Sequence, residues 1–232
     1  MTRAGLPDAP LEFSLPGAAG TIALHAPRLV VAGYTGRDQE AVVRHIEELA
    51  AIGVPPPACV PAFWTLDSSL ATQDSRISVT GADTSGEVEL VLLRSAGRLY
   101  VTVGSDHTDR GLERISVADA KRACPKPVGR TALALPPEPA GYDWDGLRLT
   151  CQVDGERYQD GLASALRTPP QLLDGLAAAD GDDGRDLIMF CGTVPLLSGR
   201  FLAGSSWQLG LEAPLEGPAG RLAHTYSVTV TG

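Results

Sequence analysis

The chain of 232 residues has a mass of 24.2 kDa, which suits one large domain, and its 44% apolar and 20% charged residues are ordinary for globular proteins. Its 19 Lys and Arg against 28 Asp and Glu give a formal charge of −9, which argues against nucleic-acid binding and against adsorption on an anionic membrane. No apolar run is long enough to span a bilayer, residues 1–15 lack a signal-peptide pattern and the four cysteines are widely spaced, so we expect a cytoplasmic protein with reduced thiols.

The first part of the chain predicts three strands followed by one helix. The strands are expected at residues 11–15, 21–24 and 28–34, each bounded by Gly or Pro. The helix is expected from Asp38, as its N-cap, to about residue 52, with Gly53 after it. Its apolar stripe consists of Val42, Val43, Ile46 and Leu49. Prolines 55–57 then predict a rigid extended connection.

The rest of the chain predicts mainly strands and turns. Strands are expected at residues 76–80, 87–93 and 99–104, with Gly97 as the hairpin signal between the last two. A short helix at 116–122 and a strand at 147–153 follow, and Asp154-Gly155 predicts a second hairpin. A helix at 168–178 precedes closing strands at 187–191, 207–211 and 223–230. This order predicts a strand-rich α+β domain without regular βαβ winding.

Three acidic residues form the first candidate site. Glu87 and Glu89 are two apart on a predicted strand, so their side chains share one face. Taken alone, this pattern is more typical of a solvated strand face. If the strands at 87–93 and 99–104 pair as a hairpin, however, Asp106 emerges beside both glutamates. Three carboxylates without His or Cys would suit Mg²⁺, Mn²⁺ or Ca²⁺ rather than zinc.

His45 and Glu48 form a second candidate pair. They are three residues apart on the predicted helix and therefore share a face, where a carboxylate can orient an imidazole as a general base. The same spacing is common among solvated residues of exposed helices. Cys124 and Cys191 have no histidine partner placed by the sequence, so we reject a thiol nucleophile.

The order of these motifs resembles the catalytic domain of the fumarylacetoacetate hydrolase superfamily from about residue 33 to the C-terminus. Residues 87–89 are similar to its Glu-x-Glu pair, and residues 105–110 to its N-D-x-[ST]-x-R-D loop. Further segments that resemble family motifs are 120–125 (the lysine segment), 153–159 (N-G-x-x-x-Q), 185–195 (G-D-x-I-x-T-G-T-P) and Gly33-Tyr34 ahead of His45 and Glu48.

Five residues depart from the family pattern: Gly111, Glu113, Cys124, Cys191 and Val194. The three acidic residues of the candidate metal site are intact. Glu113 stands in place of a glutamine, and a carboxylate cannot donate a hydrogen bond as an amide does unless it is protonated. The departures therefore bear most on the identity of the substrate.

The resemblance implies a divergent bacterial branch with a mixed β-sandwich or roll and few helices. Residues 1–32 would add N-terminal strands to the same domain, and residues 33–232 would form the catalytic domain. It also implies a homodimer and a site that binds Mg²⁺ or Mn²⁺. The implied roles are metal binding by Glu87, Glu89 and Asp106, catalysis by His45, Glu48 and Lys121, and substrate binding by Arg110, Glu113 and Thr193.

The function implied by this resemblance is hydrolysis of a carbon–carbon bond in a small oxo acid or 1,3-dicarbonyl compound. The metal would act as a Lewis acid toward two substrate oxygens. A decarboxylase or keto–enol isomerase on the same scaffold is the second interpretation, since both need the same enolate stabilisation. A catalytically silent binding protein is the third.

Overall fold

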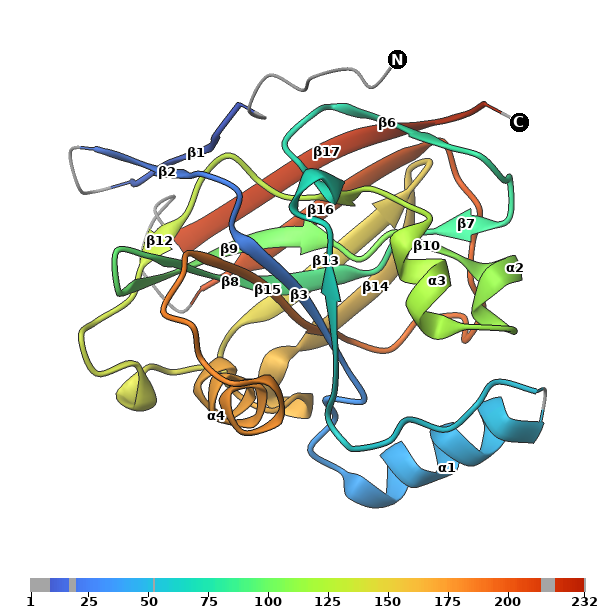
Figure 1. The fold of residues 1–232 in the computed structure, drawn as a ribbon. Helices are drawn as coiled ribbons and strands as arrows, with labels where there is room; N and C mark the ends of the chain where they lie inside the picture. Colours follow the sequence, from blue (N-terminus) through green and yellow to red (C-terminus); the bar gives the residue numbers. More distant parts are fainter. Residues whose placement is uncertain (1–8, 17–19, 52, 214–219, 232) are drawn as a thin grey trace, which may run out of the picture.

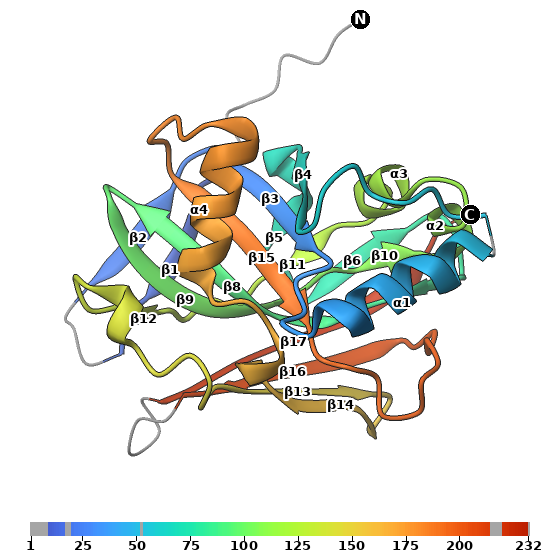
Figure 2. The same ribbon diagram turned by 90° about the horizontal axis from the view of Figure 1, so that it is seen from below.

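A computed structural model describes residues 9–16, 20–51, 53–213 and 220–231. Within them, two larger sheets face each other as two layers, best seen in Figure 2, with few helices around them (Figure 1). The strand-rich α+β fold expected from the sequence is confirmed. None of the helices in the described ranges is both long and apolar enough to cross a membrane.

The first layer is a six-stranded mixed sheet. In spatial order its strands are β12 (Leu133–Ala134), β9 (Arg98–Ser105), β8 (Val88–Ser95), β15 (Leu187–Thr193), β3 (Arg28–Gly33) and β4 (Ala62–Leu66). β15 is antiparallel to β8 and parallel to β3. The central strands are buried on both faces, which explains their nearly continuous apolar sequences.

The second layer is a five-stranded sheet. Its strands, in spatial order, are β14 (Glu156–Leu162), β13 (Arg148–Val153), β16 (Ser206–Glu212), β17 (Arg221–Val230) and β6 (Arg76–Val79). The Asp-Gly turn joins β13 to β14, as the sequence predicted, with both Asp154 and Gly155 at positive φ.

Three short two-stranded pairs and four helices complete the described fold. The pairs are β1 (Leu11–Ser14) with β2 (Thr21–Leu24), β5 (Ala71–Thr72) with β11 (Lys126–Pro127), and β7 (Thr84–Ser85) with β10 (Thr108–Asp109). The helices are α1 (Gln39–Ala51), α2 (Arg110–Glu113), α3 (Val117–Arg122) and α4 (Pro169–Asp180). Asp38 accepts a hydrogen bond from the Ala41 amide at 3.0 Å, as expected for the N-cap of α1.

Alternation along β8 divides its side chains between two apolar cores. Val88, Leu90 and Leu92 belong to the larger cluster, which also contains β13 and β16 side chains and therefore lies between the layers. Val91 and Leu93 belong to a second cluster with residues of β1 and β2. Successive side chains of a strand point to opposite faces, so β8 is held from both sides.

The β8–β9 hairpin is the element that positions the candidate site. Its register pairs Val88 with Ser105 and Glu89 with Gly104, and the amide of Asp106 donates to the Glu87 carbonyl at 3.1 Å. The predicted approach of Asp106 to the two glutamates is confirmed at the backbone. The predicted strand at 87–93 begins one residue later than expected, because Glu87 precedes β8.

Several short elements were missed by the sequence interpretation. These are the strands β4, β5, β7 and β10 to β12, the one-turn helix α2, and three 3₁₀ turns at Ser68–Leu70, Pro139–Gly141 and Ala163–Ala165. β5, β7, β10, β11 and β12 have only two residues each, too few to show a periodic pattern. The predicted end of the first helix at residue 52 lies outside the described residues.

A substitution at Gly104 would test how tightly the β8–β9 hairpin is packed. A Cβ at this position would lie 2.8 Å from the Phe190 ring and 2.8 Å from the Pro127 carbonyl oxygen, so Gly104→Ala should lower the free energy of unfolding by about 1–3 kcal/mol. Urea denaturation measures the change. Gly141→Ala is the matched control, because no atom lies within 4 Å of its Cβ, and it should shift stability by less than about 0.5 kcal/mol. Equal stabilities of the two variants would contradict the close packing.

Candidate functional site

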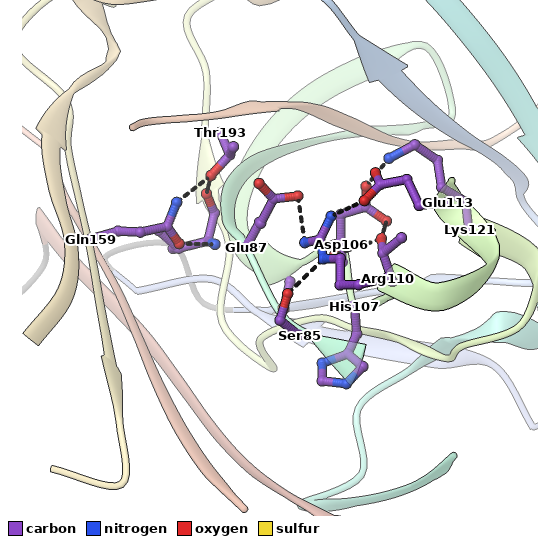
Figure 3. Close-up of polar contacts among 12 residues, drawn as sticks. Ser85, Glu87, Asp106, His107, Arg110, Glu113, Lys121, Gln159 and Thr193 are labelled. Carbon is purple, nitrogen blue, oxygen red and sulfur yellow. Dashed lines mark hydrogen bonds and ion pairs between the residues drawn. The ribbon is translucent and has the colours of Figure 1, made fainter. Parts of the chain in front are cut away.

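The candidate site lies where the start of β8, the end of β9 and the end of β15 meet helices α2 and α3. Figure 3 shows its polar side chains. Glu89 and Asp106 are 3% and 1% exposed, so two carboxylates of the predicted metal site are in the protein interior. Because a buried charge is costly unless paired, the partners of each carboxylate define the site.

Asp106 is held between two lysines. It forms an ion pair with Lys121 through one carboxylate oxygen and with Lys126 through the other, the latter at 3.0 Å. Lys126 also donates to the His107 carbonyl at 2.5 Å and is completely buried. Burial alone would raise the pKa of Asp106, but the two ammonium groups hold it well below its usual value. Asp106 is therefore a fixed anion.

Glu89 has a different environment from Asp106. Its carboxylate accepts a hydrogen bond from the Gly192 amide at 2.7 Å, and no ion pair to it is found within the described residues. Burial and the nearby charge of Asp106 raise its pKa well above the usual value, although Lys121 opposes this shift. Gly192 can approach so closely because it lies at φ +96° and lacks a Cβ, which would clash with Thr35.

Arg110 joins the third carboxylate to α2. Its guanidinium forms ion pairs with Glu87 at 3.0 Å and with Glu113 at 2.8 Å, and its Nε donates to Ser85 Oγ at 2.6 Å. It also lies over the Phe201 ring, 3.6 Å from the ring centroid. Glu113, which replaces the family's glutamine, thus neutralises the arginine and shares it with Glu87.

Thr193 belongs to a network that joins the two sheets. Its hydroxyl donates to the Val88 carbonyl at 2.8 Å and accepts from Gln159 Nε2 at 2.7 Å, while the Val88 amide donates to Gln159 Oε1 at 2.9 Å. Gln159 is on β14, in the second layer, and is completely buried. Sequence reasoning did not assign it a role, although the N-G-x-x-x-Q motif pointed to it.

His107 lies beneath this cluster and supports the loop after β9. Its ring nitrogens are each 3.0 Å from a hydroxyl, one of Tyr226 and the other of Thr84. Burial, reinforced by the charges of Lys126 and Arg110, lowers its pKa to about 3. His107 is therefore a neutral structural residue at physiological pH.

His45 and Glu48 are not in contact with this cluster. They lie on α1 with side chains 61% and 77% exposed, and the imidazole Nδ1 is 3.9 Å from the Glu48 carboxylate. The His45 ring is 6.3 Å from the ring of Tyr34, measured between centroids. For this pair to act on a substrate at the carboxylates, α1 would have to move toward them.

The two cysteines near the site are buried. Burial raises the pKa of Cys124 to about 11 and raises that of Cys191 further above its usual value. Neither thiol forms the thiolate that nucleophilic attack requires.

The three carboxylates fit a divalent cation by donor type but are not arranged around one point. Oxygen-only ligands suit Mg²⁺ or Mn²⁺, and the buried Glu89 carboxyl group has one amide beside it rather than an ion-paired cation, so a bound cation would favour its ionised form. Across the described ranges, however, no three His, Cys, Asp or Glu side chains are grouped closely enough to hold an ion. Glu87 faces Arg110 and Asp106 faces the lysines, so an ion would take the place of these cations.

The unequal pairing of Asp106 and Glu89 predicts opposite effects of removing each charge. In the metal-free protein, Asp106→Asn leaves Lys121 and Lys126 facing a neutral amide and should cost about 3–5 kcal/mol. Glu89→Gln keeps the acceptor for Gly192 but removes the repulsion, and it should stabilise the fold near pH 7 by about 1.4 kcal/mol for each unit of upward pKa shift that it abolishes.

Chemical denaturation in EDTA across a pH series measures both changes. A carboxyl group whose pKa is raised in the folded state destabilises the fold only at pH values at which the group is ionised in the unfolded chain. The gain from Glu89→Gln should therefore be largest at neutral pH and disappear below about pH 4, where both side chains are neutral. Destabilisation by both variants at neutral pH would contradict the unequal pairing.

The sequence and the fold were each compared with those of known proteins. The sequence matches the family described as "Protein of unknown function (DUF2848)" over residues 32–226. No curated protein is similar to it in sequence.

Three solved structures of similar fold cover almost all of the chain. A proposed fumarylpyruvate hydrolase from Burkholderia cenocepacia has a TM-score of 0.67 at 15% identity, with coverage of 100% of this chain and 96% of its own. Fumarylpyruvate hydrolase from Pseudomonas aeruginosa, in complex with Mn²⁺ and pyruvate, has a TM-score of 0.61 at 16% identity, and the match covers 99% of this chain and 100% of that protein. The 5-carboxymethyl-2-hydroxymuconate delta-isomerase from Mycobacterium smegmatis has a TM-score of 0.61 at 13% identity, and the match covers 97% of this chain and 99% of that protein.

The profile match covers most of the chain, and the similarity of fold extends over its whole length at low identity. The chain therefore belongs to the DUF2848 family and is a divergent branch on the fumarylacetoacetate hydrolase fold.

Proposed function

We propose that this protein is a divalent-metal-dependent hydrolase that cleaves a carbon–carbon bond of a small 2-oxo acid or 1,3-dicarbonyl compound. The observation that carries the proposal is the buried pair of carboxyl groups of Glu89 and Asp106 at the end of the β8–β9 hairpin, with Glu87 beside them in the chain and Lys121 against Asp106. The same fold in another protein was crystallised with Mn²⁺ and pyruvate, a 2-oxo acid.

Glu87, Glu89 and Asp106 would hold Mg²⁺ or Mn²⁺, which supplies Lewis-acid stabilisation of negative charge on substrate oxygens. Lys121 is buried and reaches the same carboxylates, so its ammonium can bind an anionic oxygen of the substrate. Arg110 is a second fixed cation beside Glu87, and it would orient a substrate carboxylate only by exchanging one of its partners, Glu87 or Glu113, for it. Thr193 is at the end of β15, and its hydroxyl would donate to the same group by giving up its hydrogen bond to the Val88 carbonyl.

Water activation is proposed for His45 and Glu48 on the strength of the family resemblance. The carboxylate would orient the imidazole, and the imidazole would accept a proton from the attacking water. Their exposure on α1 implies that this step requires α1 to approach the carboxylate cluster.

A metal-dependent isomerase or decarboxylase is the second candidate. An isomerase of the same fold, the 5-carboxymethyl-2-hydroxymuconate delta-isomerase, favours it. Such a reaction needs the enolate but no attacking water, so it would not depend on His45 and Glu48. A binding protein without activity is the third candidate and would turn over none of these substrates.

Metal binding is tested by thermal unfolding with and without Mn²⁺ or Mg²⁺. An ion present at 100 times its dissociation constant should stabilise the wild type by about 2.7 kcal/mol. Glu89→Gln should strongly reduce this shift, because the neutral amide oxygen binds a divalent cation more weakly than a carboxylate does. Glu156→Ala, which removes an exposed carboxylate from the β13–β14 turn, should retain it. A wild type that no divalent ion stabilises at millimolar concentration would contradict the metal site.

The role of α1 is tested by the rate of acetylpyruvate hydrolysis. His45→Ala and Glu48→Gln should each slow it by about 10²–10⁴-fold while keeping the metal-induced thermal shift. Arg44→Ala is the matched control, since Arg44 belongs to a similarly exposed pair with Glu40 on the same helix. If the three variants have equal rates, α1 takes no part in catalysis. If hydrolysis alone is lost while pyruvate enolisation continues, the proposed role of the pair in water activation is supported.

A further inference from the structure

Lysine is almost absent from this chain. Of its 19 Lys and Arg residues only two are lysines, Lys121 and Lys126, and the other 17 are arginines. Both ammonium groups lie against the same carboxylate, one at each oxygen of Asp106. A chain that uses arginine everywhere else and lysine only here indicates a task at Asp106 that an ammonium fulfils and a guanidinium does not.

The two kinds of cation cover a carboxylate differently. A guanidinium forms two parallel hydrogen bonds and so occupies both oxygens, whereas an ammonium is a compact point charge that can occupy one. Lys126 Nζ is 3.0 Å from Asp106 Oδ1, and Lys121 contacts Oδ2. If one lysine leaves, one oxygen becomes free for another cation while the other oxygen keeps its partner.

Lys126 is the fixed member of the pair. Its side chain is completely buried, and Nζ also donates to the His107 carbonyl at 2.5 Å. It lies between Pro125 and Pro127, whose rings restrict the backbone, and β11 is paired with β5. A buried ammonium that left Asp106 would lose its counter-charge without gaining water, which is costly. Lys126 therefore stays at Asp106.

Lys121 is the member that can move. Its side chain is 9% exposed and belongs to the short helix α3. Nζ is 5.2 Å from the centroid of the half-buried Trp64 ring, whose face attracts a cation independently of Asp106. An ion that binds Asp106 would therefore displace Lys121 rather than Lys126.

We propose that Lys126 is a permanent counter-cation of Asp106 that lowers the affinity of the carboxylates for a metal ion, whereas Lys121 exchanges its place with the ion. This inference rests on the proposed function. Repulsion between positive charges is strong at low dielectric and grows in proportion to the charge of the ion. Lys126 acts through Asp106 and is thus a positioning residue, which does not touch the substrate.

The experiment measures ion binding to the full-length wild type and to Lys126→Met, in which an apolar group of similar length replaces the ammonium. Calorimetry should give Mn²⁺ binding at least about tenfold tighter in the variant, because one repelling charge is gone. A merely structural role of Lys126 would instead weaken binding. Arg122→Met is the matched control, since it removes an exposed positive charge next to Lys121 in α3, and it should leave the affinity unchanged.

A pair of ions tests whether the effect is one of charge. Ca²⁺ and Tb³⁺ both bind oxygen ligands and have nearly equal radii, but they differ in charge. The gain in affinity from Lys126→Met should be larger for Tb³⁺ than for Ca²⁺, because the repulsion scales with the charge of the ion.

Amine labelling tests the exchange in the native protein. The two lysines are the only side-chain amines, so acetylation of each by an N-hydroxysuccinimide ester can be followed by mass spectrometry. Saturating Mn²⁺ should increase the labelling rate of Lys121 and leave Lys126 protected. Equal gains at both lysines, or no gain at Lys121, would overturn the division of roles. This measurement decides the matter if Lys126→Met does not fold.

The affinities separate this inference from the proposed function. Equal or weaker Mn²⁺ binding by Lys126→Met, or equal gains for Ca²⁺ and Tb³⁺, would overturn the role of Lys126 and leave the metal site intact. Binding of no ion by either protein would overturn the metal site and this inference with it.

Discussion

The structure depends on the pairing of charges that it buries. Asp106, Lys121 and Lys126 are all nearly or completely buried, and none could be there alone, because an unpaired ion in the protein interior costs several kcal/mol. Lys121 is on α3 and Lys126 begins β11, which follows α3 in the chain. Their ion pairs with Asp106 therefore connect both α3 and β11 to the end of β9. One aspartate thus joins a helix and a strand to the hairpin that carries the glutamates.

The site needs both sheets to be in place. Glu87 and Glu89 come from the first layer, but the backbone between them is held by Gln159 from the second. Gln159 satisfies the Val88 amide and the Thr193 hydroxyl together, so the end of β15 and the start of β8 are fixed relative to each other. A buried network in which each member is satisfied specifies one geometry, which a carboxylate cluster requires.

The sequence predicted local features well and the pairing of charges poorly. The hairpin from 87 to 104 and the approach of Asp106 followed from alternation and Gly97, which are local signals. Lys126 carried no signal, because its role arises from the parallel pairing of β11 with β5, two strands of two residues each. Arg110 was predicted to bind substrate, and nothing in the sequence indicated its ion pairs with Glu87 and Glu113. Contacts between residues distant in sequence leave no periodic trace, so the cations around the carboxylates could not be placed.

The same charge pairing constrains how a divalent ion and a substrate would bind at the proposed site. Glu87 and Glu113 share Arg110, and Asp106 faces Lys121 and Lys126, so three carboxylates and three cations are paired, while Glu89 is a fourth carboxyl group with a raised pKa and without an ion pair among the described residues. A divalent ion among the carboxylates would add positive charge to a region of low dielectric, where an uncompensated charge is costly. The carboxylate of an oxo acid would offset part of this charge, and Lys121 could contact it if the ion took its place at Asp106. Occupation of the site by the ion and by an anionic substrate would then favour each other.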